Sequence, residues 1–475
     1  MSMPGLIFLL IKWSMQDSNN GEKNIHPKEL LSIANRLYQL QAVACDLNAE
    51  GSLELKLRPI LIQQGADQGR VGDDILSLKR QLDWFEKTDN RYYDDLFKSK
   101  TNITIRTFFE ISSYLCLRVN ARQSPVIDIG KILIDLSPWH SFDEIIFYLD
   151  FLGIKIDKIP EFMQHHAWPN NPVAEYFSDT PFFSKPLILM RDKIVVSNRR
   201  TFLRSMSTLG SVSLKRYDGR KFKEKFGASL EIYVSKILNE AKLIFQTEAI
   251  TRELYAKNKV KGKVVDFIIE DKNRIFLDCK AIEPNAYINT LADQKLLAEG
   301  LAENYIKAIW QGQECCHIFN KYGQPQEKIP FLIIVVHRDH YLSSGARVQE
   351  YLGVDIQNEI GLKYGYIPIP LRHIYYVTIH DFERLIQAGI SGIANISSIL
   401  EGAVQDDMLK ETSNLLFSMH LDKIKAPNNA ELVLSAQSQF EIVHNHVIEN
   451  AKLWNGEVIH FIAARSALMQ KMEKM

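Results

Sequence analysis

One short stretch constrains the fold of this chain more than any other. Residues 264 to 280 read VVDFIIEDKNRIFLDCK, with a polar turn between two runs of Val, Ile, Phe and Leu. The pattern predicts a β-hairpin whose strands enter a hydrophobic core. Because side chains alternate along a strand, Phe276, Asp278 and Lys280 share one face. Cys279 lies on the other face, so the core-facing hairpin also carries a carboxylate and an amine.

The length of the turn decides where a second carboxylate, that of Asp266, points. A three-residue loop, 271–273, would pair Glu270 with Arg274. That pairing sets Asp266 directly opposite Asp278. An asparagine at the third loop position suits the left-handed conformation that such a loop requires. A loop with an even number of residues would turn the Asp266 side chain to the opposite face of the sheet.

Two carboxylates side by side on an apolar hairpin are destabilising unless a positive charge neutralises them. A divalent cation is the simplest solution, and hard oxygen ligands suit Mg²⁺, with Mn²⁺ as an alternative. Lys280, on the same face, would stand beside this cation. There it would orient or help to deprotonate a water and balance charge in a phosphoryl-transfer transition state. Asp266, Asp278 and Lys280 are therefore the predicted catalytic residues.

The order of predicted elements around the hairpin indicates an α/β core with a mixed sheet. The predictions are a helix from 221, a strand around 245–256, the hairpin, a helix over 291–312, and strands at 331–336 and 374–379 before a further helix. A chain of 475 residues is too long for one ordinary core. The predicted segments are a mainly helical N-terminal domain at 1–175, a β-hairpin and basic connector at 176–217, the α/β domain at 218–390 and a helical region at 391–475.

The hairpin and the helix before it resemble the PD-(D/E)XK nuclease superfamily. Asp266, eleven intervening residues and then Asp278-x-Lys280 are similar to its metal-binding motif, with Val265 in place of the proline. GASLEIYV is similar to the pattern of its preceding helix and puts Glu231 in the position of an additional acid. The resemblance covers 218–390 and implies a restriction-endonuclease-like mixed sheet flanked by helices. It also implies that Glu231 completes or supports the metal site.

The function implied by the resemblance is metal-dependent hydrolysis of phosphodiester bonds, with DNA as the expected substrate and a 5′-phosphate and a 3′-hydroxyl as product ends. Bacterial restriction or antiviral defence is the expected context. The family often has a Gln or Lys on the next helix facing the site, and Gln294 and Lys307 are the candidates. Two alternatives remain open. One is a nuclease that processes RNA or structured DNA, and the other is a non-catalytic nucleic-acid-binding scaffold of the same fold.

The chain has no net charge that would favour nucleic-acid binding, since Lys plus Arg and Asp plus Glu both number 57. Only local clusters of basic residues support such binding. Between residues 191 and 225 the chain has eleven Lys and Arg against three acids, a net charge of 11 − 3 = +8. Lysines also precede Asp266. A solvated basic face would have the same composition. The predicted phosphate-binding residues are Lys215, Arg216, Arg220, Lys221, Lys261 and Lys263.

The remaining features exclude several classes of protein. Five cysteines without a CxxC pair argue against a disulfide framework and a zinc knuckle, and favour a reducing cytoplasm. The apolar run at 6–11 is too short to cross a membrane, so no membrane partner is expected. It predicts a buried strand or the start of a helix. The helical regions are expected to serve homo-oligomerisation or a partner protein.

Overall fold

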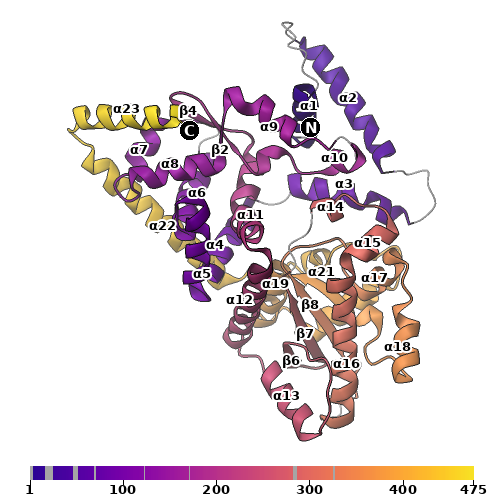
Figure 1. Ribbon diagram of the computed structural model, residues 1–475. Coiled ribbons are helices and arrows are strands. Elements are labelled where there is room, and N and C mark those ends of the chain that lie inside the picture. Colours follow the sequence, from indigo (N-terminus) through magenta and orange to yellow (C-terminus); the bar gives the residue numbers. More distant parts are fainter. Residues whose placement is uncertain are drawn as a thin grey trace. The chain divides into compact units, whose positions relative to one another are not determined.

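The computed structural model describes residues 4–16, 25–45, 52–68, 71–121, 124–168, 170, 172–281, 286–324 and 327–474. The protein is a mainly helical α/β protein, 68% helix, with two small mixed β-sheets. Its chain forms two compact units. The first contains residues 1–47, 63–222 and 431–475, and the second contains residues 48–62 and 223–430. Figure 1 shows the elements of both.

The first unit combines helices with a four-stranded sheet of order β1-β4-β3-β2. Its strands are β1 (Val126–Asp128), β2 (Gly153–Lys155), β3 (Leu187–Leu189) and β4 (Lys193–Val196). Its helices are α1 (Pro4–Gln16), α2 (Pro27–Ala44), α4 (Val71–Lys87), α5 (Asn90–Thr101), α6 (Ile105–Ala121), α7 (Ile129–Leu136), α8 (Phe142–Leu152), η1 (Ile156–Lys158), α9 (Ile159–His165), α10 (Pro172–Phe177), η2 (Pro181–Phe183), α11 (Arg199–Tyr217) and α23 (Val458–Lys474). β3 and β4 are antiparallel, which confirms the predicted short hairpin.

The second unit contains a five-stranded sheet of order β5-β6-β7-β8-β9. The strands are β5 (Phe245–Thr247), β6 (Phe267–Glu270), β7 (Arg274–Lys280), β8 (Phe331–Val336) and β9 (Ile374–Thr378). β5, β6 and β7 pair antiparallel, and β7, β8 and β9 pair parallel. Every residue of β8 is buried, as expected for a central strand covered on both faces. The predicted mixed sheet and its two later strands are confirmed.

The other elements that lie wholly in the second unit are helical. They are α13 (Glu248–Lys257), α14 (Ala286–Asn289), α15 (Gln294–Leu301), the π-helical turn η3 (Ala302–Ile306), α16 (Lys307–Tyr322), α17 (Gly345–Leu352), α18 (Ile356–Tyr364), η4 (Leu371–His373), α19 (Ile379–Ile390), α20 (Ile396–Asp407) and α21 (Phe417–Lys423). Three helices continue from one unit into the other: α3 (Leu53–Gln68), α12 (Gly219–Glu240) and α22 (Ala430–Leu453).

The main core of the second unit lies between the sheet and α16. Ile268 of β6, Phe276 of β7 and Leu332 of β8 belong to one buried cluster with Ile309 and Cys316 of α16. Figure 1 shows α16 alongside the sheet. Because side chains alternate along each strand, the face that holds Ile268 and Phe276 is also the face to which Asp266 and Asp278 belong.

Two predicted elements are wrong in part. The strand expected over 245–256 ends at Thr247, and α13 follows. EAITRELYAK buries Thr251 and Tyr255 but leaves Glu253 between them exposed, which fits one face of a helix, whereas a strand would put all three on one face. The helix expected over 291–312 is interrupted by the π-helical turn η3, and its last part, α16, extends to Tyr322. The apolar run at 6–11 lies inside the helix α1.

The spatial grouping differs from the linear order of the predicted segments. Residues 391–430 belong to the same unit as the α/β core, whereas 431–475 belong to the unit of the N-terminal helices. Within the ranges that the structure describes, no helix has the length and apolar character needed to span a membrane. All five cysteines are buried free thiols.

The close approach of α16 to β8 generates a stability prediction. At Gly312 an added Cβ would lie 2.4 Å from Leu332 Cδ2, whose side chain is fully buried. Gly312→Ala should therefore lower the free energy of unfolding by about 1–2 kcal/mol, because overpacking outweighs the better helix propensity. Gly361→Ala is the matched control: it lies in α18 with open space around it, and should stabilise by about 0.5–1 kcal/mol. Thermal unfolding of both variants measures the difference, and equal shifts would contradict the packing argument.

Candidate active site

The turn of the hairpin has the predicted register. Glu270 pairs with Arg274 and Phe267 with Leu277, so the loop has three residues, 271–273. The left-handed conformation expected at Asn273 is wrong, because Asn273 is not among the described residues with positive φ. Its backbone N–H donates instead to Ser397 Oγ at 2.9 Å, and its Nδ2 donates to the Ile329 carbonyl at 2.9 Å. Contacts from distant segments hold the turn.

Asp278 and Lys280 form the centre of the site. The Asp278 side chain is fully buried, and its Oδ2 lies 2.6 Å from the Lys280 Nζ. Gln311 of α16 donates from Nε2 to Asp278 Oδ1 at 2.8 Å and to the Val264 carbonyl at 2.7 Å. The Lys280 Nζ donates to Gln311 Oε1 at 3.3 Å. One helix residue thus fixes both the carboxylate and the amine.

Asp266 stands where β6 and β7 separate. The ladder between the strands ends at Phe267 and Leu277. Beyond that pair the Asp266 carboxylate replaces the strand partner, because its Oδ2 accepts the Cys279 N–H at 2.6 Å. This contact holds the carboxylate at the end of the hairpin. By strand alternation, Asp266 belongs to the same face as Ile268.

Burial is the largest cause that raises the pKa of each carboxyl group at the site. The pKa of Asp278 rises to about 7, first because of burial; Lys280 lowers it, while Asp266 and Glu231 raise it. Burial also raises the pKa of Asp266, against the hydrogen bond from the Cys279 backbone. The pKa of Glu231, on α12, rises to about 7 through burial, then Asp266 and Glu248. Three carboxyl groups share one negative potential, which favours binding of a cation.

Lys280 remains the positive charge of this site. Burial lowers the pKa of its amine, but the attraction of Asp278 and Asp266 outweighs burial, and the net pKa is raised. The amine is therefore protonated at neutral pH. It balances one carboxylate only, so the site with both aspartates ionised carries excess negative charge.

The donor set fits a divalent cation at the two aspartates. Asp278 Oδ2 is buried and accepts no hydrogen bond of regular geometry from any described residue, although the Lys280 amine is near. Carboxylate oxygens are the hard ligands that Mg²⁺ and Mn²⁺ prefer. In the described ranges no three His, Cys, Asp or Glu side chains are grouped to hold a metal ion. The role of Glu231 as a third ligand stays a prediction.

The structure does not bring Gln294 or Lys307 to this cluster. Gln294 donates to the Glu350 carbonyl at 3.2 Å, and Lys307 pairs with Glu303 at 3.0 Å. The residue that sequence reasoning missed is Gln311, one helical turn after Lys307. A glutamine four residues after a candidate lysine could have been considered from the sequence. Which face of α16 meets the sheet, however, depends on residues of other strands.

The predicted phosphate-binding residues fall into two groups. Lys215 and Arg216 lie in the last turn of α11, and Arg220 and Lys221 in the first turn of α12, all in the first unit. Lys221 Nζ lies 5.0 Å from the centre of the Tyr92 ring. Lys261 and Lys263 are exposed in the segment before β6, in the second unit. Only these last two belong to the unit that contains Asp278.

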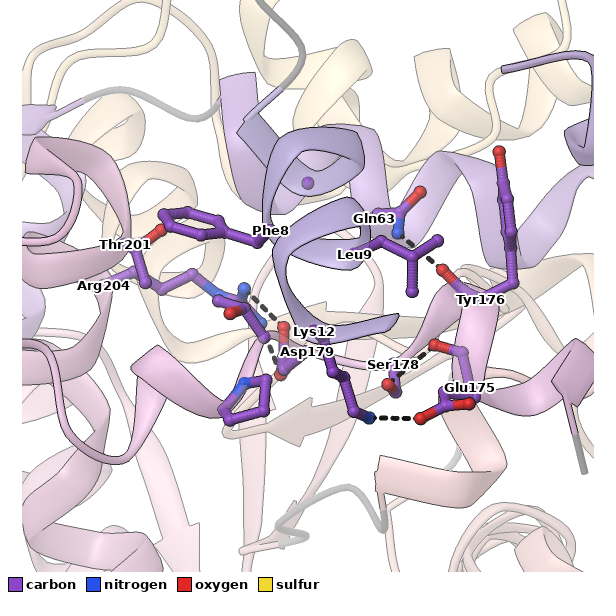
Figure 2. Close-up of a pocket in the computed structure, with 13 residues that line it drawn as sticks. Phe8, Leu9, Lys12, Gln63, Glu175, Tyr176, Ser178, Asp179, Thr201 and Arg204 are labelled. Atoms are coloured by element: carbon purple, nitrogen blue, oxygen red, sulfur yellow. Dashed lines mark hydrogen bonds and ion pairs between the residues drawn. The ribbon is translucent and has the colours of Figure 1, made fainter. Parts of the chain in front are cut away.

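A cavity of about 40 Å³ in the first unit has a different character (Figure 2). Its charged side chains are paired with one another: Lys12 with Glu175 at 2.6 Å, and Arg204 with Asp179 at 2.7 Å. Figure 2 shows both pairs beside Phe8 and Leu9 of α1. The ion pair of Lys12 with Glu175 attaches α1 to α10. Because the four charged side chains that line the cavity are paired, we assign it a structural role.

Comparison with known proteins identifies no relative of this chain. No family model, curated protein or solved structure matches the chain. The function is therefore inferred from the residues of the site.

The raised pKa of Asp278 predicts how stability changes with pH. Its folded-state value of about 7 exceeds the unfolded value of about 4, so the folded state binds this proton more tightly. Stability from this group is present at low pH and is lost as pH rises from about 4 to about 7. In EDTA, the Tm of wild type should fall through this window more steeply than that of Asp278→Asn. The difference corresponds to at most about 1.4 kcal/mol per pH unit.

Asp95→Asn is the control, since Asp95 is largely exposed on α5. It should leave the pH profile of the Tm unchanged. Identical profiles for wild type and Asp278→Asn would show that Asp278 does not titrate in this window.

Proposed function

We propose that the second unit is a metal-dependent nuclease that hydrolyses phosphodiester bonds, with DNA as its substrate. One observation carries this proposal: Asp266 and Asp278 lie at the open end of a hairpin with a three-residue loop, and the Lys280 amine lies 2.6 Å from Asp278. A buried site of excess negative charge beside a fixed ammonium is suited to a divalent cation and a phosphate together. The resemblance of these residues to a nuclease motif supports the same proposal.

In this proposal Asp266 and Asp278 hold the cation, and Glu231 completes or supports its binding. The bound cation would supply Lewis-acid stabilisation of the phosphate and a more acidic water. Lys280 has a raised pKa and so enters the reaction protonated. It orients the water by donating a hydrogen bond and stabilises the negative charge that develops on the phosphate oxygens. Gln311 is a positioning residue, because it fixes the orientation of both Asp278 and Lys280.

Cleavage of RNA or structured DNA is the alternative within the same chemistry. A non-catalytic scaffold of the same fold would have no need for the charged cluster, which costs folding energy to bury. We therefore place catalysis ahead of the scaffold. Bacterial restriction or antiviral defence is the biological setting that we propose for a DNA nuclease of this kind.

The first test is cleavage. Wild-type protein incubated with plasmid, linear duplex, single strands and RNA should cut one of them with Mg²⁺ or Mn²⁺ and none with EDTA. Lys280→Ala and Asp278→Asn should each lower the cleavage rate at least about 100-fold, because each removes charge needed in the transition state. Lys295→Ala, an exposed lysine on α15, is the matched control and should cut like wild type. Full activity of Lys280→Ala would overturn the assigned mechanism.

The second test is binding of the cation without substrate. Mg²⁺ or Mn²⁺ should raise the Tm of wild type, because a ligand of the folded state stabilises it by mass action and relieves the repulsion between the two aspartates. Asp278→Asn should lose most of this increase. An equal Tm increase in both proteins would show that the cation binds elsewhere.

A further inference from the structure

Aromatic rings gather around one lysine at partly exposed positions of α16 and on the chain around α18. We call this group the aromatic–lysine strip; it consists of Trp310, His317, Lys363, Tyr364 and Tyr366. Lys363 Nζ lies 5.2 Å from the centre of the Trp310 ring and 5.0 Å from that of Tyr364. Tyr366 is 43% exposed, and the side chain of Lys363 is 50% exposed.

The strip is ordered by its own contacts. The His317 ring centre lies 4.6 Å from that of Tyr364 and 5.6 Å from that of Tyr366. His317 Nδ1 is 3.2 Å from the Tyr366 hydroxyl. Partial burial and then Lys321 lower the pKa of His317, Glu314 raises it, and Lys363 lowers it, so the net pKa is lowered. The result is a row of rings with Lys363 over two of them and with Glu314 beside that lysine.

A continuous path of contacts joins the strip to the candidate active site. Gln311, which contacts Asp278, follows Trp310 on α16 and donates to the Val264 carbonyl. The chain just before Val264 lies against the same helix: at Gly262 an added Cβ would be 2.8 Å from Glu314 Oε1. Glu314 in turn lies 4.0 Å from Lys363. Lys261 and Lys263, on either side of Gly262, are exposed on this path.

We propose that the aromatic–lysine strip binds single-stranded nucleic acid by stacking unpaired bases on Trp310 and Tyr366, with the phosphates on Lys363, Lys261 and Lys263. The inference rests on the proposed function, because it assigns the substrate form of that same site. Aromatic faces accept any base, and lysines along them follow the backbone of a flexible strand. A rigid duplex keeps its base faces stacked internally, so it would use the lysines and leave the rings unused.

The Lys363 ammonium does not block this binding. Its contact with Trp310 is an exposed cation–π contact, which is weaker than the stacking of a base on the same ring. An arriving base would replace the ammonium over the ring, and the ammonium would then meet the phosphate of that nucleotide. One cation–π contact would thus be replaced by two contacts, a base stacked on the ring and an ammonium at a phosphate.

The test is equilibrium binding in EDTA, where no cleavage takes place. Labelled dT20, a 20-residue RNA strand and a 20-base-pair duplex are titrated with full-length protein and followed by fluorescence anisotropy. Trp310→Ala and Tyr366→Ala should each weaken single-strand binding about 5- to 100-fold and change duplex binding less than twofold. Trp310→Phe should restore most of the affinity. Tyr38→Ala, which removes a ring 51% exposed on α2, is the control and should bind like wild type.

Charge gives an independent measurement. Lys363→Ala should reduce the slope of log Kd against log salt concentration by about 0.7 for single strands, the value for one lost phosphate contact. Trp310→Ala should weaken binding without changing this slope. Because Trp310 also packs on the core, its variants are checked by Tm, and Tyr366→Ala decides the outcome if Trp310→Ala is unstable.

The outcomes separate this inference from the proposed function. Metal-dependent cleavage together with single-strand binding unaffected by Tyr366→Ala and Lys363→Ala overturns the strip and leaves the nuclease intact. Strand binding that depends on the strip, without cleavage under any metal condition, supports the strip and overturns the nuclease. A wild-type preference for the duplex overturns the strip. So does a Trp310→Ala variant that changes sedimentation but not strand binding, because a second copy then covers the strip.

Discussion

The buried charge pair of Asp278 and Lys280 is the interaction on which the rest of the candidate site depends. Burying a carboxylate completely is costly unless a cation and hydrogen bonds compensate. The Lys280 ammonium lies 2.6 Å from Asp278 Oδ2, and Gln311 donates a hydrogen bond to Asp278 Oδ1. The remaining negative charge comes from Asp266 and Glu231, whose pKa values are raised together with that of Asp278. A stable fold has little use for such an excess, whereas a site that binds a cation requires it.

The helix α16 supports both sides of this arrangement. On its inner side, Gly312 lets the backbone approach Leu332 of β8, and this closeness brings Gln311 within hydrogen-bond distance of Asp278. At partly exposed positions of the same helix, Trp310 and His317 form part of the aromatic–lysine strip. Adjacent residues of one rigid helix therefore face the proposed chemistry and the proposed strand-binding surface. In this proposal, a strand that stacks on the strip would lie along the helix that also holds Gln311 against Asp278.

Local pattern was enough to predict several parts of the fold. Alternation along VVDFIIEDKNRIFLDCK predicted the hairpin and the shared face of Asp278 and Lys280, whereas the face of Asp266 depended on a three-residue loop, which the pairing of Glu270 with Arg274 confirms. The later strands were also predictable, because continuous apolar runs in a chain of this kind become buried strands. The segment at 248–257 was not recognised as helix α13, because a short run with β-branched residues fits both periods.

What the sequence by itself determined is which residues carry charge on the core side of a hairpin, since a period of two is a property of the strand alone. Only the tertiary structure decided that Gln311, and not Gln294 or Lys307, meets that charge, because the inward face of α16 is selected by packing against three strands. Likewise Asn273 is held by Ser397, more than one hundred residues later, and not by its own backbone preference. The strip too exists only after α16 and α18 are packed, since its rings come from segments some fifty residues apart.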